Sequence, residues 1–251
     1  MSSRADSPVL ADLRLRIARL EGGPRVEGAL PFGLSALDSR LPGGGLMLGA
    51  LHEVAGGPDG AMDGAAALFA AGIAARVTGP VLWCVTRADL FAPGLAQAGL
   101  SPGRVIHVEA GDNRGVLVCM EEGLCHGGLG AVVGEVARLP MVASRRLHLA
   151  ARESGSIAIA LRRWRRQTEA RDFGQPTAAM TRWQISALPS RPLPVPGVGR
   201  ARWRVELIRA RAGACLEMEL EACDDSGHLG LPADMADGPV AAEGWRHSAA
   251  G

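Results

Sequence analysis

Apolar runs alternate with helix-like segments through the first part of the chain. A continuous apolar run is typical of a strand buried on both faces of a parallel sheet, and one occurs at residues 81–86. Further strands are expected at residues 49–54, 104–110, 129–133 and 156–161. Helical patterns are expected between them, at residues 64–76, 90–100, 116–127 and 145–152. The alternation predicts an α/β core with a mainly parallel central sheet flanked by helices.

The pattern changes near residue 180. The segments TRWQISAL, ARWRVELIRARAG and CLEMELEACDDSG alternate between polar and apolar residues, which is typical of half-exposed antiparallel strands. A proline-rich stretch at 189–199 joins the first two, and a short turn that suits a hairpin joins the last two. We therefore expect C-terminal antiparallel strands, followed by a flexible tail over residues 232–251.

The N-terminal segment SPVLADLRLRIARLEGG predicts a short amphipathic helix. Apolar residues recur there at helical spacing, and they are Leu10, Leu13, Ile17 and Leu20. The predicted organisation is an N-terminal helix and linker over 1–24, one domain over 25–231 and a tail over 232–251. The helix either packs on its own domain or serves self-association or partner binding.

Charge is unevenly distributed along the 251 residues. The formal net charge is +1, from 27 arginines and 26 acidic residues, and the chain contains no lysine. Residues 138–211 hold 16 arginines against four acidic residues, whereas residues 212–251 hold one arginine against eight. The basic segment predicts a surface for a polyanion or an acidic partner. A solvated arginine face paired with the acidic tail is the alternative.

Composition excludes several classes of protein. A hydrophobic content of 47% argues against wholesale disorder, and no run reaches the roughly 18 apolar residues of a membrane span. The five cysteines form no CxxC pair, so neither a disulfide framework nor a zinc site is expected. These features predict a cytoplasmic globular protein without a bound metal.

The stretch GGPDGAMDGAAAL at residues 56–68 is similar to a phosphate-binding loop. The motif GxxxxGK[ST] holds phosphate and Mg²⁺ with backbone N–H groups, a lysine and a hydroxyl. If Gly57 and Gly64 are its two glycines, the loop is two residues too long and alanines replace the lysine and the Ser/Thr. The sequence thus predicts a vestigial phosphate loop, made up of Gly56, Gly57, Gly60, Gly64, Ala65 and Ala66.

The stretch LPFGLSALDSRLPGGGLMLGALHEVAG, residues 30–56, resembles the opening of the RecA-type ATPase core. With RRLHLAARESG and GRARWRVEL, it makes the chain similar to the ImuA family over residues 9–230. The resemblance implies a RecA-like, non-catalytic accessory protein of SOS mutagenesis and translesion synthesis, without a cofactor. Implied partners are the RecA recombinase, the polymerase-like ImuB and an error-prone polymerase at damaged DNA, with association to the nucleoid on DNA damage.

The acidic residues that a RecA-like ATPase needs are also displaced. The magnesium-binding acid is expected where Gly134 stands, with Glu135 one residue late, and the water-activating acid falls on Ala88, with Asp89 next to it. These departures predict that the chain does not hydrolyse ATP. The alternatives are an atypical nucleotide-binding protein, or a cell-division inhibitor of the SOS type, which also resembles part of the RecA pattern.

The segment LRRWRRQTEARDFG, residues 161–174, follows a predicted strand. The resemblance places it where RecA-like cores contact single-stranded DNA. Guanidinium groups suit phosphates and an indole stacks on a base. The candidate nucleic-acid or partner residues are Arg145, Arg146, Arg162, Arg163, Trp164, Arg165, Arg166 and Arg171. A solvated basic loop with Trp164 packed inward is the alternative.

Overall fold

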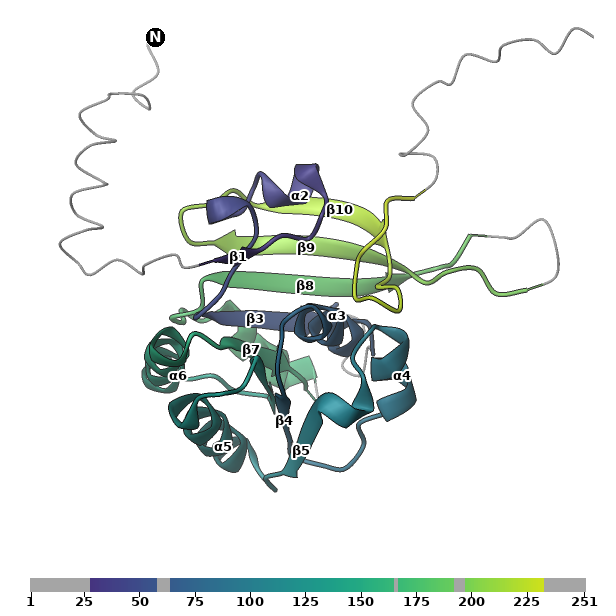
Figure 1. The fold of residues 1–251 in the computed structure, drawn as a ribbon. Helices are drawn as coiled ribbons and strands as arrows, with labels where there is room; N and C mark the ends of the chain where they lie inside the picture. The colour runs from purple at the N-terminus through teal and green to yellow at the C-terminus, as the bar shows by residue number, and fades with distance from the viewer. Residues whose placement is uncertain (1–27, 58–63, 165–166, 192–196, 233–251) are drawn as a thin grey trace, which may run out of the picture.

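A single eight-stranded sheet forms the centre of the computed structural model, which describes residues 28–57, 64–164, 167–191 and 197–232 (Figure 1). The strand order is β10-β9-β8-β3-β7-β6-β4-β5. The strands are β3 (Leu51–Gly56), β4 (Val81–Val85), β5 (Val105–Glu109), β6 (Ala131–Val136), β7 (Ile157–Arg162), β8 (Thr181–Leu188), β9 (Arg202–Ala210) and β10 (Leu216–Glu221). A separate two-stranded sheet pairs β1 (Ala29–Leu30) with β2 (Leu46–Met47).

The central sheet is parallel from β5 to β8 and antiparallel from β8 to β10. The prediction of a mainly parallel sheet with C-terminal antiparallel strands is therefore confirmed. One strand differs from expectation, because β8 pairs with β3 in parallel as well as with β9 in antiparallel fashion. It has neighbours on both sides, and its first three residues are buried rather than half-exposed.

Helices cover both faces of the sheet (Figure 1). On one face lie α3 (Gly64–Ala75) and α4 (Ala92–Gln97), and on the other lie α5 (Asn113–His126) and α6 (Met141–Ser154). Short elements complete the described chain: α2 (Ser35–Asp38) and the 3-10 helices η1 (Pro42–Gly44), η2 (Pro102–Arg104) and η3 (Gln167–Gly174). None of the helices in the described ranges has the length and apolar character needed to cross a bilayer.

Local capping decides where α5 and α6 begin. Asp112 accepts a hydrogen bond from the backbone N–H of Gly115 at 2.7 Å, so α5 begins three residues before the expected Val116. Pro140 is the N-cap of α6 and makes no side-chain cap hydrogen bond; the helix begins at Met141, four residues before the segment 145–152 that was expected to be helical. Gly155 ends α6 in the left-handed conformation at φ 75°.

The core is built around α3, which is apolar on all sides. The ring of Phe69 on this helix lies 5.6 Å from the ring of Trp183 on β8 and 6.4 Å from that of Trp203 on β9. Phe32, in the loop after β1, stacks on the same phenylalanine at 5.9 Å. These aromatic contacts attach the antiparallel strands to the parallel part of the sheet.

The two edges of the sheet differ in character. At β10, Glu217, Glu219 and Glu221 form ion pairs with arginines on or just before β9, at 3.4, 2.6 and 3.1 Å. At the opposite edge, Ile106 on β5 is 48% exposed, and no described strand pairs with the outer side of β5. Charged side chains protect an edge from further strand pairing; the β10 edge has them along its whole length, whereas β5 has the exposed Glu109 at its end.

A buried histidine links β3 to β8. The ring of His52 makes hydrogen bonds at 2.7 Å to the Thr181 hydroxyl and at 2.8 Å to the Met47 carbonyl. The hydroxyl of Thr181 also accepts a hydrogen bond from the Trp183 indole at 2.7 Å. Burial lowers the pKa of His52 from 6.5 to about 4, with a smaller contribution from the nearby His148.

We expect the stability of the protein to fall in acid because of His52. Since its folded-state pKa lies below that of the unfolded chain, its contribution is complete above pH 6.5 and is lost as the pH falls towards 4. The loss amounts to about 3 kcal/mol at most. Urea unfolding of the wild type and a His52→Gln variant across this range measures it. Parallel curves for the two proteins would refute the assignment, and His107→Gln, at an exposed site, serves as control.

Two predicted regions lie outside the described residues. They are the N-terminal helix with Leu10, Leu13, Ile17 and Leu20, and the tail from residue 233 onward. The proposed domain boundaries at 24/25 and 231/232 accordingly stay predictions. Arg165, Arg166 and Gly60 also lie outside the described ranges.

Candidate functional site

The predicted vestigial loop connects β3 to α3. β3 ends at Gly56 and α3 begins at Gly64, and residues 58–63 between them are not described. Gly57 is buried against β8, where an added Cβ would lie 2.3 Å from the Oγ of Ser186. Close packing between the two strands therefore accounts for glycine at this position without any phosphate.

The alanines predicted to stand at the lysine and hydroxyl positions of a phosphate loop belong to the core. Ala65 and Ala66 are 5% and 3% exposed and lie in the first turn of α3, within the main apolar cluster. A lysine at either position would have the base of its side chain in the apolar core, and the chain would have to extend out of the core to bring the ammonium group to water. Both side chains supply packing at the start of this helix, and neither brings a charge or a hydroxyl.

The two displaced acids meet at one arginine. Arg163, just after β7, forms a two-armed ion pair with Asp89, with N···O distances of 3.0 and 3.2 Å, and also pairs with Glu135. Glu135 is buried and accepts a hydrogen bond from the Trp83 indole at 3.1 Å. Burial opposes the charge of Arg163, but the carboxylates of Glu135 and Asp89 raise the pKa of its guanidinium above the ordinary value.

This cluster, Asp89, Glu135 and Arg163, lies at the carboxyl ends of β4, β6 and β7. In open α/β sheets ligands bind at that end of the strands. Here the guanidinium of Arg163 is ion-paired with both carboxylates, so they are poorly suited to bind a cation. Within the described ranges, no three His, Cys, Asp or Glu side chains are grouped to hold a metal ion.

Gly134 is packed against α5 on the opposite face of β6 from Glu135. A Cβ at Gly134 would lie 2.1 Å from the Sδ of Met120 and 3.0 Å from a methyl group of Val116. The position expected to carry a magnesium-binding acid therefore has no room for any side chain. Successive residues of a strand point to opposite faces, which explains why Glu135 occupies the other environment.

A second, largely buried ionic cluster lies across β8, β3 and β7. Glu53 on β3 receives hydrogen bonds from Arg162 and Arg182, each at 3.0 Å, and from the Thr177 hydroxyl. Arg162 also pairs with Asp172 of η3. The Arg182 guanidinium lies 5.1 Å from the centre of the Phe173 ring. We call Glu53, Arg162, Arg182 and Asp172 the buried ionic cluster; it fastens η3 to the sheet.

Two of the predicted nucleic-acid residues are internal. Arg162 is 1% exposed and Trp164 is 6% exposed, and the Trp164 indole donates a hydrogen bond to the Ala137 carbonyl at 3.1 Å. The prediction that these two side chains contact a ligand at the surface is wrong, because both are buried and make their contacts inside the protein. The alternative of Trp164 packed inward is the arrangement found.

The remaining described candidates are at the surface. Arg145, Arg146 and Arg171 are exposed, and Arg146 forms an ion pair with Glu121 at 2.7 Å. Arg163 is partly exposed but already paired with two acids. The predicted basic cluster therefore separates into an internal half and a surface half.

Sequence reasoning missed the partners of the internal arginines. A charged residue inside a continuous apolar strand, such as Glu53 or Arg162, does signal a buried pair. The sequence does not indicate which residues pair, since 109 positions separate these two. It also missed Arg209 and Arg211, although both fall in the basic segment 138–211 and lie beside Arg145.

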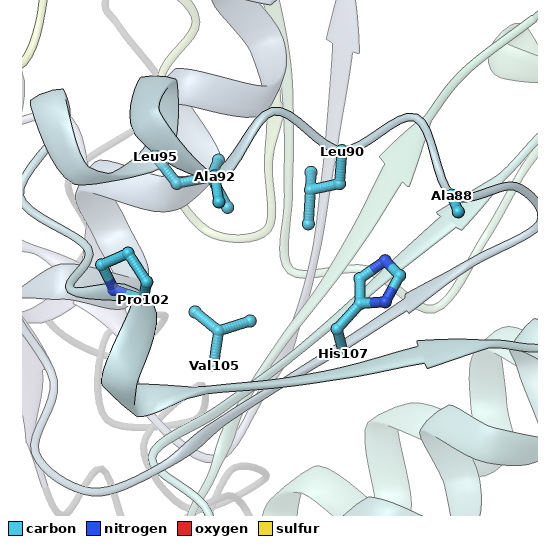
Figure 2. Close-up of a pocket in the computed structure, with 7 residues that line it drawn as sticks. All are labelled: Ala88, Leu90, Ala92, Leu95, Pro102, Val105 and His107. Atoms are coloured by element: carbon cyan, nitrogen blue, oxygen red, sulfur yellow. The ribbon is translucent and has the colours of Figure 1, made fainter.

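An apolar pocket opens beside the edge strand β5 (Figure 2). It has a volume of about 250 Å³ and lies between α4 with its preceding loop and β5. The neighbouring Phe91 is 70% exposed. The pocket contains one titratable side chain and is lined by Ala88, Leu90, Ala92, Leu95, Pro102, Val105 and His107. This composition suits an apolar side chain better than a phosphate.

Comparison with known proteins places the chain in a family. The solved structure of the RadB recombinase superimposes with a TM-score of 0.53 at 18% identity, covering 81% of this chain and 99% of that one; it shows a shared fold. No protein-family model matches the sequence. Protein ImuA from two strains of Caulobacter vibrioides, NA1000 / CB15N and ATCC 19089 / CIP 103742 / CB 15, is 38% identical over 239 residues, which cover 89% of this chain and 97% of the relative. The chain belongs to the ImuA family.

Proposed function

We propose that this protein is a non-catalytic accessory protein of damage-induced (SOS) mutagenesis and translesion synthesis. It acts by binding the RecA recombinase, the polymerase-like ImuB with its error-prone polymerase, and single-stranded DNA. Membership of the ImuA family and the fold shared with a recombinase support this role. The exposed apolar pocket beside β5 gives a protein partner a place for an apolar side chain.

The cluster of Asp89, Glu135 and Arg163 is the main support for a non-catalytic role. Phosphoryl transfer depends on a free carboxylate for Mg²⁺, on a residue that positions the water, and on positive charge at the phosphates. In this chain Asp89 and Glu135 are both ion-paired to Arg163. The alanines that we assign to the positions of the lysine and the hydroxyl are buried. Each of these substitutions removes one part of the chemistry.

We expect the tagged full-length chain to enrich the recombinase and the polymerase-like partner from DNA-damaged cells. Nuclease treatment of the lysate should leave that enrichment in place, since the proposal rests on protein contacts. The measurement is quantitative mass spectrometry of the captured proteins, with undamaged cells and the tag alone as controls. Absence of both partners would contradict the proposal.

Two further outcomes identify the alternatives. Phosphate release by the purified chain with single-stranded DNA, abolished in a Glu135→Gln variant, would establish an atypical nucleotide-dependent enzyme instead. A filamentation phenotype on overexpression, with normal damage-induced mutation in a deletion strain, would establish a cell-division inhibitor. The proposal requires that the purified chain release no phosphate. It also requires that overexpression cause no filamentation and that a deletion strain lose damage-induced mutation.

A further inference from the structure

A basic groove lies between α6, the segment 176–178 and the end of β9. It has a volume of about 370 Å³ and is open to solvent. Four of the residues that line it are Arg145 and His148 from α6 and Arg209 and Arg211 from the end of β9. The lining contains no acidic side chain, and Thr177, which hydrogen-bonds to Glu53, separates the groove from the buried ionic cluster.

The fold brings these side chains together from segments far apart in the sequence. On α6, residues 145, 148 and 152 follow helical spacing and share one face. Arg209 lies opposite Arg182 in the pairing of β8 with β9, so it faces the same side of the sheet as the buried ionic cluster. Its guanidinium donates to the Thr177 carbonyl at 3.2 Å, which anchors it across the segment 176–178.

The cations of the groove are not neutralised within the described part of the chain. Arg146, Arg200, Arg202 and Arg204, which are also at least partly exposed, each have a carboxylate partner. Within the same described ranges, Arg145 and Arg211 form neither an ion pair nor a side-chain hydrogen bond, and both are exposed. A concave surface with uncompensated charge of one sign concentrates the field that attracts a ligand of opposite charge.

The pKa of His148 is affected by the positive charges around the groove. Its Nδ1 accepts the backbone N–H of Leu51 at 3.4 Å, so in the neutral ring Nε2 carries the proton and remains a donor. Burial lowers the pKa of His148, and the charges of Arg211 and Arg152 lower it further. Charges of one sign therefore act on this ring from two elements, α6 and the end of β9.

We propose that this groove binds the phosphates of single-stranded DNA, with Arg145 and Arg211 as its principal contacts and Arg209 and His148 as supporting donors. The inference rests on the single-stranded DNA part of the proposed function and assigns that part a site. Arg145 and His148 lie about 4.5 Å apart along α6, and Arg209 and Arg211 line the same groove, so its donors are distributed along it, which suits a ligand with repeated charges. The apolar side chains of Met141, Leu149 and Pro176 line the same groove and suit the sugars and base faces.

Binding of a labelled oligothymidylate to the full-length chain, measured by fluorescence anisotropy over a range of salt concentrations, tests the groove. A double variant, Arg145→Ala with Arg211→Ala, should weaken binding about tenfold or more and reduce the slope of log K against log salt by about two. The matched control is Arg202→Ala with Arg204→Ala, which also removes two arginines that are at least partly exposed. It should change affinity less than about twofold, because both are already paired with glutamates on β10.

Every other outcome overturns the assignment. Equal weakening by the two double variants would mean that net charge, and not the groove, determines binding. Binding of an acidic peptide such as polyglutamate in place of the oligonucleotide, with the same dependence on Arg145 and Arg211, would assign the groove to a protein partner. No binding of the oligonucleotide would remove DNA from the function, whereas nuclease-resistant capture of the recombinase and polymerase-like partner would leave the rest of the proposed function intact.

Discussion

Replacing Glu53 with alanine should lower the free energy of unfolding by about 3–5 kcal/mol. This carboxylate is completely buried and bonds to Arg162 and Arg182 at 3.0 Å each. Its removal leaves two buried guanidinium groups with less compensation, and Arg162 keeps only Asp172 as an acidic partner. Isothermal denaturation in urea, followed by circular dichroism, measures the change.

Two companion variants separate the causes of that loss. Glu53→Gln keeps an acceptor oxygen without the charge and should fall between alanine and the wild type. Glu217→Ala breaks an exposed pair, whose side chains are 45% and 63% exposed and 3.4 Å apart, and should cost less than about 1 kcal/mol. Similar losses for Glu53→Ala and Glu217→Ala would contradict the importance assigned to the buried ionic cluster.

Replacing Gly134 with aspartate should destabilise the protein by about 3 kcal/mol or more. The substitution places an acid where a RecA-like ATPase would hold magnesium, but the Cβ alone would come within 2.1 Å of the Met120 sulfur. Steric overlap and a buried, unpaired carboxylate both disfavour the folded state. The same urea denaturation measures the effect.

Gly134→Ala isolates the steric part of this effect and should cost about 1–3 kcal/mol. Gly103→Ala is the matched control, because an added Cβ there would meet only the Ser101 hydroxyl, at 3.8 Å. It should change stability by less than about 0.5 kcal/mol. A Gly134→Asp protein as stable as the wild type would show that α5 can move aside.

Much of the fold follows from local pattern. Four of the five runs that predicted parallel strands are buried on both faces, and the edge strand β5 is partly exposed. The glycine-rich segment lies between a strand and a helix, as expected. The helix starts were less accurate, because Asp112 and Pro140 set them and neither belongs to the apolar repeat. The position of β8 depends on its two neighbours, and alternation within eight residues does not encode that.

The candidate site was harder to predict because its important contacts join distant positions. Arg163 and Asp89 are 74 residues apart, and Thr177 and Glu53 are 124 apart. A run of arginines looks the same in sequence whether its side chains turn inward or outward. Only the burial of Arg162 and Trp164 shows that part of this run belongs to the architecture, which leaves the exposed arginines on α6 and after β9 as the surface to test.

The unlike edges of the sheet limit how this protein can associate through its backbone. Because the paired glutamates and arginines along β10 oppose another strand, we expect an extended segment of a partner to add next to β5 rather than next to β10. Growth of copies edge to edge into an open-ended ribbon would need both edges, so addition at β5 alone would stop at one segment for each domain.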